Sequence, residues 1–303
     1  MIDKKYHSRY NFYVQRRWNE RQMIIMKVLL PISLFFFSMF FAVLSITFTI
    51  MLEAWFNFKI KHPFYTTWGV LFLLSYLSAL SQLHRYKVEP FKLNDSIDRT
   101  LVLSPDKMTM LNNVLDELVI AFGLSKRPDV WFVKSKCGGT GYLMFTNDGF
   151  DLVFNPKYVE KLSRGELSCV IAYLLAGYLT KSSETVMQAR LFLDAGLDAR
   201  GVGKNAWAFN ILIYIGLLPL FVQMMIINRV NTYNCDNIAS NVVRSVPSLV
   251  SALTKAKGFD LDDSDGSDDL NNDTNDTNDN HYDFVSDFSK IDRRIRHVQK
   301  LNW

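Results

Sequence analysis

The segment from Leu162 to Thr180 reads L-S-R-G-E-L-S-C-V-I-A-Y-L-L-A-G-Y-L-T. It predicts a helix that begins at Leu162-Ser163 and continues to Thr180. Residues four apart, such as Cys169 and Tyr173, share one face of this helix. The chemistry open to the protein therefore depends on which side chains occupy that face.

Zinc-binding helices of the H-E-x-x-H type place two histidines at i and i+4 so that both imidazoles point at one Zn²⁺, and the Glu after the first His acts as general base. Counted from Ser163-Arg164-Gly165-Glu166-Leu167, the five motif positions fall on Tyr173, Leu174, Leu175, Ala176 and Gly177. A register shifted by one residue puts Leu174, Leu175 and Tyr178 at the key positions. Neither set of side chains binds zinc.

Other segments surround this helix in a recognisable order. A predicted helix at 105–122 and a strand at 130–133 precede a glycine-containing hairpin and Asn155-Pro156-Lys157-Tyr158. Downstream, Thr232-Tyr233-Asn234-Cys235-Asp236 is similar to an E-[FY]-x-A-D segment, and Ile291-Asp292-Arg293-Arg294-Ile295 is similar to an E-x-R-I helix. With these segments, residues 25–300 resemble the HtpX and CAAX-prenyl-protease family of membrane zinc metallopeptidases.

The resemblance implies an α+β, mostly helical fold, in which a zincin-like (gluzincin-type) domain is attached to an N-terminal transmembrane helix hairpin. In that family the leading Glu of the downstream segment is the third zinc ligand, and Thr232 stands in its place here. The degenerate positions are thus Tyr173, Leu174, Gly177 and Thr232. Tyr233 and Asp236 keep the family's residue types, so we expect the scaffold without a metal and without catalytic residues.

The histidines lead to the same expectation without any alignment. All five, His7, His62, His84, His281 and His297, are too scattered for two to share a helical face. An alternative zinc site could be assembled from Cys169, Cys235 and Asp236 if the fold brings the two segments together. Three isolated cysteines in 303 residues are more often buried as small apolar side chains.

Two uncharged apolar segments predict a transmembrane hairpin at 28–84. Residues 28–52 lack any charge and, at about 1.5 Å per residue, exceed the roughly 30 Å of hydrocarbon in a bilayer. The second segment, 64–83, ends at the basic run His84-Arg85-Tyr86-Lys87. Residues 1–27 carry seven Lys and Arg against two acids, so the positive-inside rule predicts a cytoplasmic N-terminus and a cytoplasmic main domain.

A third apolar segment, 206–227, has to return to the side of the membrane that it left if the helix at 163–180 is to meet 232–236. Gly216 and Pro219 divide it into arms of about ten residues, a length typical of re-entrant or buried helices. We therefore expect a membrane-dipping hairpin or a buried helix rather than a single span.

The main domain is expected at 85–259. Ser104-Pro105 starts an amphipathic helix that Gly123 ends, and strands are expected at 130–133, 142–145 and 150–154. In the resembled family, the strand before the metal helix offers its free edge to an extended substrate peptide. The candidate residues of such a groove are Tyr142, Leu143, Met144, Tyr173, Tyr233 and Asp236.

Residues 260–283 contain ten Asp and five Asn without Lys or Arg, and their composition predicts a disordered insertion. Since the whole chain has a net charge of +4, the rest of it carries +14, which suits an anionic membrane surface. The segment 284–303 is expected to form an amphipathic helix that packs on the domain. Its apolar stripe is Phe288, Ile291, Ile295 and Val298, and its basic face is Lys290, Arg293, Arg294, Arg296 and Lys300.

The sequence thus predicts a catalytically inactive, metallopeptidase-like integral membrane protein without a cofactor. We expect it to bind polypeptide segments or a partner protease in the quality control of membrane proteins, with the lipid bilayer as a partner and no nucleic acid. One alternative is a zinc-dependent metalloendopeptidase with an atypical site, which would use the cysteines. Another is a structural membrane protein without a surviving groove.

Overall fold

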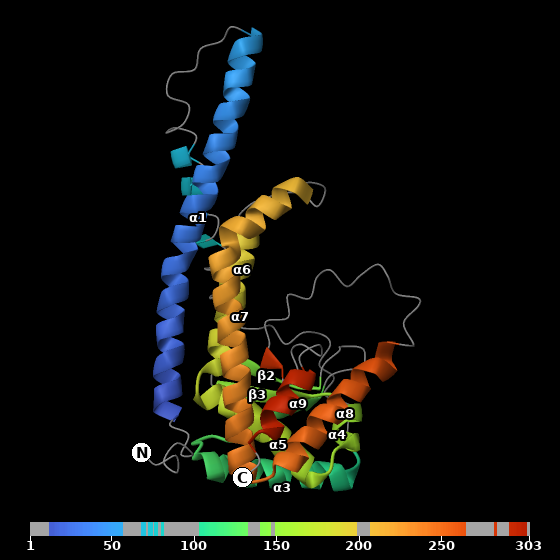
Figure 1. Cartoon of the computed structure of the whole chain (residues 1–303). Helices are drawn as coiled ribbons and strands as arrows, with labels where there is room; N and C mark the ends of the chain where they lie inside the picture. Colours follow the sequence, from blue (N-terminus) through green and yellow to red (C-terminus); the bar gives the residue numbers. More distant parts are fainter. Residues whose placement is uncertain are drawn as a thin grey trace. The chain divides into compact units, whose positions relative to one another are not determined.

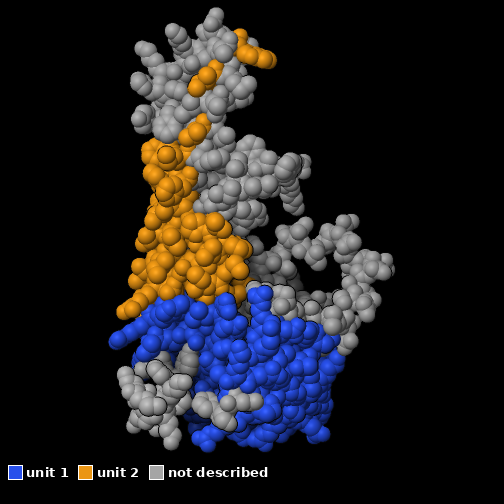
Figure 2. Space-filling view, viewed as in Figure 1, with its two compact units in different colours: residues 1–19, 90–187, 229–303 blue, residues 20–89, 188–228 orange. Residues whose placement is uncertain are grey.

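The computed structural model describes residues 12–56, 68–70, 72–74, 76–77, 80–81, 103–132, 140–146, 149–198, 207–264, 282–283 and 291–301. The chain divides into two compact units (Figure 2). Unit 1 comprises residues 1–19, 90–187 and 229–303, and unit 2 comprises residues 20–89 and 188–228. Three helices, α1 (Phe12–Phe56), α6 (Ser182–Asp198) and α7 (Trp207–Val243), contribute to both units.

The predicted first membrane span, 28–52, lies inside the 45-residue helix α1. In unit 2, Met26, Leu30 and Leu34 of α1 are buried, while Val28 and Ile32 between them are exposed. No helix in the part of the chain that the structure describes is both long and apolar enough to cross a membrane. Only half of the predicted second span, 64–83, falls within the described residues, and these residues are helical.

The predicted arms of 206–227 do not form two separate helices, because α7 is one helix from Trp207 to Val243 with Pro219 inside it, although its axis bends (Figure 1). Proline holds φ near the helical value, so the helix continues through it, but the ring removes one backbone hydrogen bond and kinks the axis. On either side of it the helix keeps adding one bond per residue. The segment is also not a buried helix over its described side chains, since Leu218, Val222 and Met225 are about half exposed.

Unit 1 contains a small sheet with strand order β1-β3-β2-β4, in which β4 is Tyr282–Asp283. β1 (Val130–Phe132) runs parallel to β3 (Gly149–Phe154), which pairs antiparallel with β2 (Gly141–Thr146). These are the three strands predicted from the sequence, and their first and last residues differ from the predicted ones by no more than one position. α3 (Pro105–Phe122) is also as predicted, and Gly123 ends it in the left-handed conformation at φ 65°. The fold class, α+β and mostly helical, is confirmed (Figure 1).

The segment 162–180, which was predicted to be helical, contains α5 (Arg164–Leu179), and α4 (Pro156–Lys161) precedes it. Ser163 accepts a hydrogen bond from the amide of Glu166, and the Glu166 carboxylate accepts one from the amide of Ser163, which makes a complete capping box. Most of α5 is buried all round, as expected for a helix with neighbours on every side. Those neighbours in unit 1 are α3, β2 and α8 (Val246–Ser264), and α8 in turn packs against α9 (Ile291–Gln299) (Figure 1).

At both ends of the segment 260–283, which was predicted to be disordered, the structure has regular secondary structure. Residues 260–264 continue α8, because extending an existing helix gains one backbone bond per residue. Tyr282–Asp283 forms β4, which gains ladder hydrogen bonds on β2. The rest of the insertion lies outside the described residues. Of the predicted C-terminal helix, α9 covers Ile291–Gln299 and residues 300–301 form a turn, while 284–290 and 302–303 lie outside the described residues.

Candidate functional site

The site begins at Tyr173, which stands at the first His position of the H-E-x-x-H frame. α5 places this side chain in the core of unit 1, where it is only 1% exposed. The guanidinium of Arg294 lies over its ring, with Cζ 4.7 Å from the ring centroid. A cationic side chain of the protein therefore lies against the face of the buried Tyr173 ring.

Arg294 also joins α9 to α7 through a buried ion pair with Asp236. Its Nε donates to Oδ2 of Asp236 at 3.0 Å, and its Nη2 donates to Oδ1 at 2.6 Å. Both side chains are almost completely buried. Burial raises the pKa of the Asp236 carboxyl, and the two hydrogen bonds and the positive charge of Arg294 counter that shift. The pair holds three helices, α5, α7 and α9, at one point of the core.

Arg294 was predicted to lie on the basic outer face of the last helix, and this prediction is wrong. Arg294 is three residues after Ile291 and four before Val298, so it belongs to the same helical stripe as these two buried residues. This spacing is visible in the sequence and could have predicted that Arg294 is buried. The guanidinium is tolerated inside because Asp236 supplies an opposite charge with two hydrogen bonds.

A second contact between α7 and α9 lies beside the ion pair. The rings of Tyr233 and His297 stack with centroids 4.2 Å apart and planes 17° from parallel. A ring nitrogen of His297 is 3.1 Å from Oδ1 of Asn237. Burial lowers the pKa of His297, as do the positive charges of Lys300 and Arg229, whereas Asp236 opposes this change. Tyr233 itself is half-buried, so one edge of this contact is open to solvent.

The degenerate positions differ in burial. Leu174 and Gly177 are buried within α5, while Thr232 on α7 is half-buried. Tyr173 and Asp236 meet through Arg294, as expected if the helix at 163–180 packs against 232–236.

The cysteine alternative for zinc does not fit the residues present. Burial and the nearby charge of Glu166 raise the pKa of the Cys169 thiol to about 12, so it would resist the deprotonation that zinc binding requires. Its Sγ lies 3.7 Å from the carbonyl oxygen of Ser245. Asp236 is committed to Arg294 at both oxygens. Among the described residues, no three His, Cys, Asp or Glu side chains are grouped closely enough to hold a metal ion.

The residues predicted to form a peptide groove differ from the expectation in strand pairing and in burial. β2 is not a free edge at Tyr142 and Leu143, because these residues pair with Asp283 and Tyr282 of β4. The side chains of Leu143 and Met144 are also buried, at 0% and 3% exposure. The sequence missed β4 because Tyr282 and Asp283 end a tract whose composition favours disorder.

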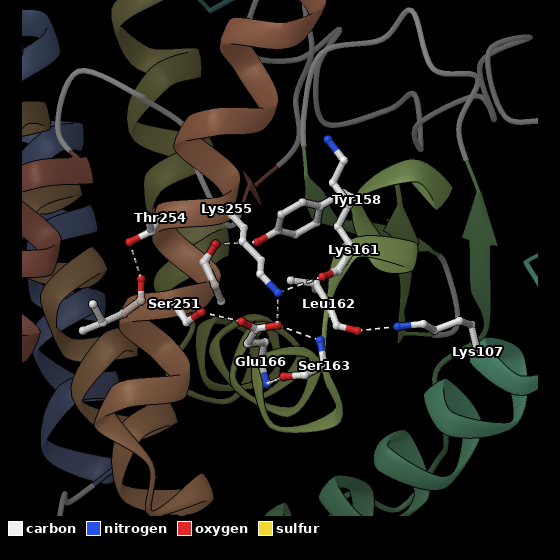
Figure 3. A network of polar contacts seen from close by, with 11 residues as sticks. Lys107, Tyr158, Lys161, Leu162, Ser163, Glu166, Ser251, Thr254 and Lys255 are labelled. Atoms are coloured by element: carbon white, nitrogen blue, oxygen red, sulfur yellow. Dashed lines mark hydrogen bonds and ion pairs between the residues drawn. The ribbon is translucent and has the colours of Figure 1, made fainter.

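A polar network at the start of α5 was not predicted as a unit (Figure 3). Lys255 of α8 donates to Oε2 of Glu166 at 2.7 Å, and Ser251 donates to Oε1. Burial by itself would raise the pKa of Glu166, but the hydrogen bonds from Lys255, Ser251 and Ser163 outweigh it and lower the pKa to about 2. Tyr158 of α4 adds a bond from its hydroxyl to the carbonyl of Ala252 at 2.9 Å. These contacts fix α5 against α8 and so set where Tyr173 lies.

Comparisons of the chain with models of protein families, with curated proteins and with solved structures find no match. The geometry of the site therefore has to carry the functional argument.

Proposed function

We propose that this chain is a catalytically inactive, metallopeptidase-like membrane protein that acts by binding rather than by hydrolysis. The observation that carries the proposal is the position of Arg294, between the ring of Tyr173 and the carboxylate of Asp236. In the family that the sequence resembles, a metal held by α5 would occupy this region. Here an internal cation already neutralises the buried carboxylate.

The side chains at these positions lack the chemistry that a metallopeptidase needs. A metallopeptidase lowers the pKa of a metal-bound water, and this requires ligands that hold the metal next to a general base. Tyr173, Leu174 and Gly177 provide neither ligand nor base. Both oxygens of Asp236 are already hydrogen-bonded to Arg294, so this carboxylate is not available as a metal ligand.

Membrane anchoring through unit 2 is part of the proposal. It is supported by large apolar side chains that stay exposed along α1 and α7, since soluble monomers rarely leave wide apolar surfaces uncovered. These residues are Ile24, Val28, Ile32, Phe36 and Met39 of α1, and Leu218, Phe221, Val222, Met225 and Ile226 of α7. The basic residues that precede the apolar part of α1 favour a cytoplasmic N-terminus and a cytoplasmic main domain.

The binding partner that we propose is a polypeptide segment in the membrane or a partner protease, in the quality control of membrane proteins. Burial of Leu143, Met144 and Tyr173 favours a contact outside the predicted groove. The exposed apolar face of α7 is the surface that fits such a partner. The same burial favours a second candidate function, a structural membrane protein without a surviving groove.

A photo-crosslinking amino acid placed at Phe221 or Val222 separates these two functions. The control is the same substitution at Ile120, which is 81% exposed on α3 of unit 1. Binding predicts protein adducts in native membranes from positions 221 and 222 and none from 120. Adducts with lipid alone at 221 and 222 would contradict the binding function and favour the structural one.

A further inference from the structure

Basic residues lie at and beside the contact between Tyr233 of α7 and His297 of α9. Arg229 lies one helical turn before Tyr233 on α7, and its guanidinium carbon is 5.6 Å from the centroid of the Tyr233 ring. His297 of α9 stacks on the same ring at 4.2 Å. Lys300 follows His297 by three residues, and its amide donates to the carbonyl of His297 at 3.1 Å. Arg229 and Lys300 are both exposed.

The carboxylates of α7 and α9, Asp236 and Asp292, already have partners. Asp236 gives both oxygens to Arg294, and Asp292 gives both to Lys257 at 2.8 and 2.9 Å. No carboxylate of the described residues pairs with Arg229 or Lys300. The positive potential at the edge of Tyr233 therefore remains available to an anion from outside.

The position of Arg229 along α7 indicates where that anion would come from. It follows the exposed apolar residues Met225 and Ile226 of the same helix by three to four residues. At about 1.5 Å per residue this is roughly 5 Å along the axis. If the exposed apolar part of α7 contacts lipid, as the proposed function requires, Arg229 lies at the depth of the headgroups, where cationic side chains are favoured.

We propose that Arg229 and His297, which both contact the ring of Tyr233, form a site for the phosphate of an anionic lipid headgroup together with Lys300, which lies one helical turn after His297. The two permanent cations attract the phosphate, and the imidazole supplies a hydrogen-bond donor when it is protonated. This inference rests on the proposed membrane association. To that association the inference adds the class of lipid, anionic phospholipids, and the residues that bind its headgroup.

The test uses the full chain in an uncharged detergent, with short-chain phosphatidylserine, phosphatidylcholine of the same acyl length, and inorganic phosphate as three separate ligands. The readout is the pKa of His297, followed by NMR of histidine-labelled protein and assigned with a His297→Gln variant. A bound anion stabilises the imidazolium, so phosphatidylserine should raise the pKa of His297, whereas phosphatidylcholine should leave it unchanged.

Arg229→Gln and Lys300→Gln should each raise the half-saturating concentration of phosphatidylserine about fivefold. Lys126→Gln, at an exposed lysine between α3 and β1, is the matched control and should leave that concentration unchanged. Equal shifts with both lipids, or equal effects of all three variants, would overturn the headgroup site. A shift with inorganic phosphate alone would show a free-anion site and would also overturn the lipid assignment.

Membrane association is scored separately, by carbonate extraction of cell membranes. Release of the chain by carbonate contradicts the proposed anchoring. A chain that stays in the membrane but shows no preference for the anionic lipid contradicts only the headgroup site.

Discussion

Arg294 and Asp236, which are 58 positions apart in the sequence, form a doubly hydrogen-bonded ion pair in the core of unit 1. The pair is shielded from water on all sides, with exposures of 5% and 0% for the two side chains. Removing one member would leave the other charge buried without a partner. Such a loss costs about 3–5 kcal/mol, more than most surface ion pairs contribute.

We therefore expect Arg294→Met to lower the free energy of unfolding by about 3–5 kcal/mol, and Arg294→Met combined with Asp236→Leu to recover a large part of it. Denaturant unfolding of the purified full chain in detergent measures both. Arg293→Met, at the exposed neighbouring residue, should change stability by less than about 0.5 kcal/mol. A loss below about 1 kcal/mol for Arg294→Met would contradict the buried pair.

The network around Glu166 predicts a loss of stability in acid. Its pKa of about 2 in the folded protein lies below the ordinary value of 4.5, so the folded state favours the charged form. The stabilisation is fully present above pH 4.5 and is lost as the pH falls from about 4.5 to about 2. It amounts to about 3 kcal/mol at most.

Glu166→Gln should accordingly destabilise the chain at pH 7 and remove this part of the acid dependence. The control is Glu117→Gln, since Glu117 forms an exposed ion pair with Arg164 and should contribute less than about 1 kcal/mol. Unfolding curves between pH 2 and pH 7 compare the two variants. An acid dependence that survives Glu166→Gln in full would show that other groups cause it.

Two glycines should respond to alanine with opposite signs. A Cβ at Gly141 would lie 2.6 Å from Cδ1 of the buried Phe154 ring, so Gly141→Ala should cost about 1–3 kcal/mol. Gly258 lies inside α8 with nothing within 4 Å of its would-be Cβ, and Gly258→Ala should stabilise by up to about 1 kcal/mol. Thermal unfolding midpoints of the two variants give the signs directly. Destabilisation by Gly258→Ala would show that this helix is not formed as described.

The buried cysteines should be chemically inert in the native protein. Burial and the charge of Glu166 raise the pKa of Cys169 to about 12, and Cys235 is completely buried. At pH 8 neither should react with iodoacetamide within an hour, and both should react in denaturant. Peptide mass spectrometry gives the modified fraction at each position. Stoichiometric labelling of native Cys169 would mean that a thiolate is present after all.

Local signals in the sequence predicted much of unit 1. Ser104-Pro105 and Gly123 bound α3 because a cap, a first-turn proline and a left-handed glycine act over a few residues. The three longer strands and α5 follow in the same way from alternation and from the Ser163 start. Pro219 shows where a local signal fails. One proline does not end a helix when backbone hydrogen bonds continue before and after it.

Contacts between distant segments were harder to predict. Tyr173, Tyr233 and Asp236 were all candidates, but the residue that joins Tyr173 to Asp236 was assigned to the surface because arginine is seldom buried. Its partner lies on another helix, and no local pattern specifies that pairing. β4 was missed for a related reason, since two residues gain strand structure only from the ladder that β2 offers them.

If the internal cation Arg294 takes the place of a catalytic metal, the purified protein should contain almost no bound metal. The full chain is produced with zinc in the medium, purified in detergent without chelators and analysed by elemental mass spectrometry beside a Cys169→Ser/Cys235→Ser variant. We predict less than about a tenth of a metal ion per chain in both proteins. Near-stoichiometric zinc that disappears in the double variant would contradict the account and would show a metal site built from cysteines.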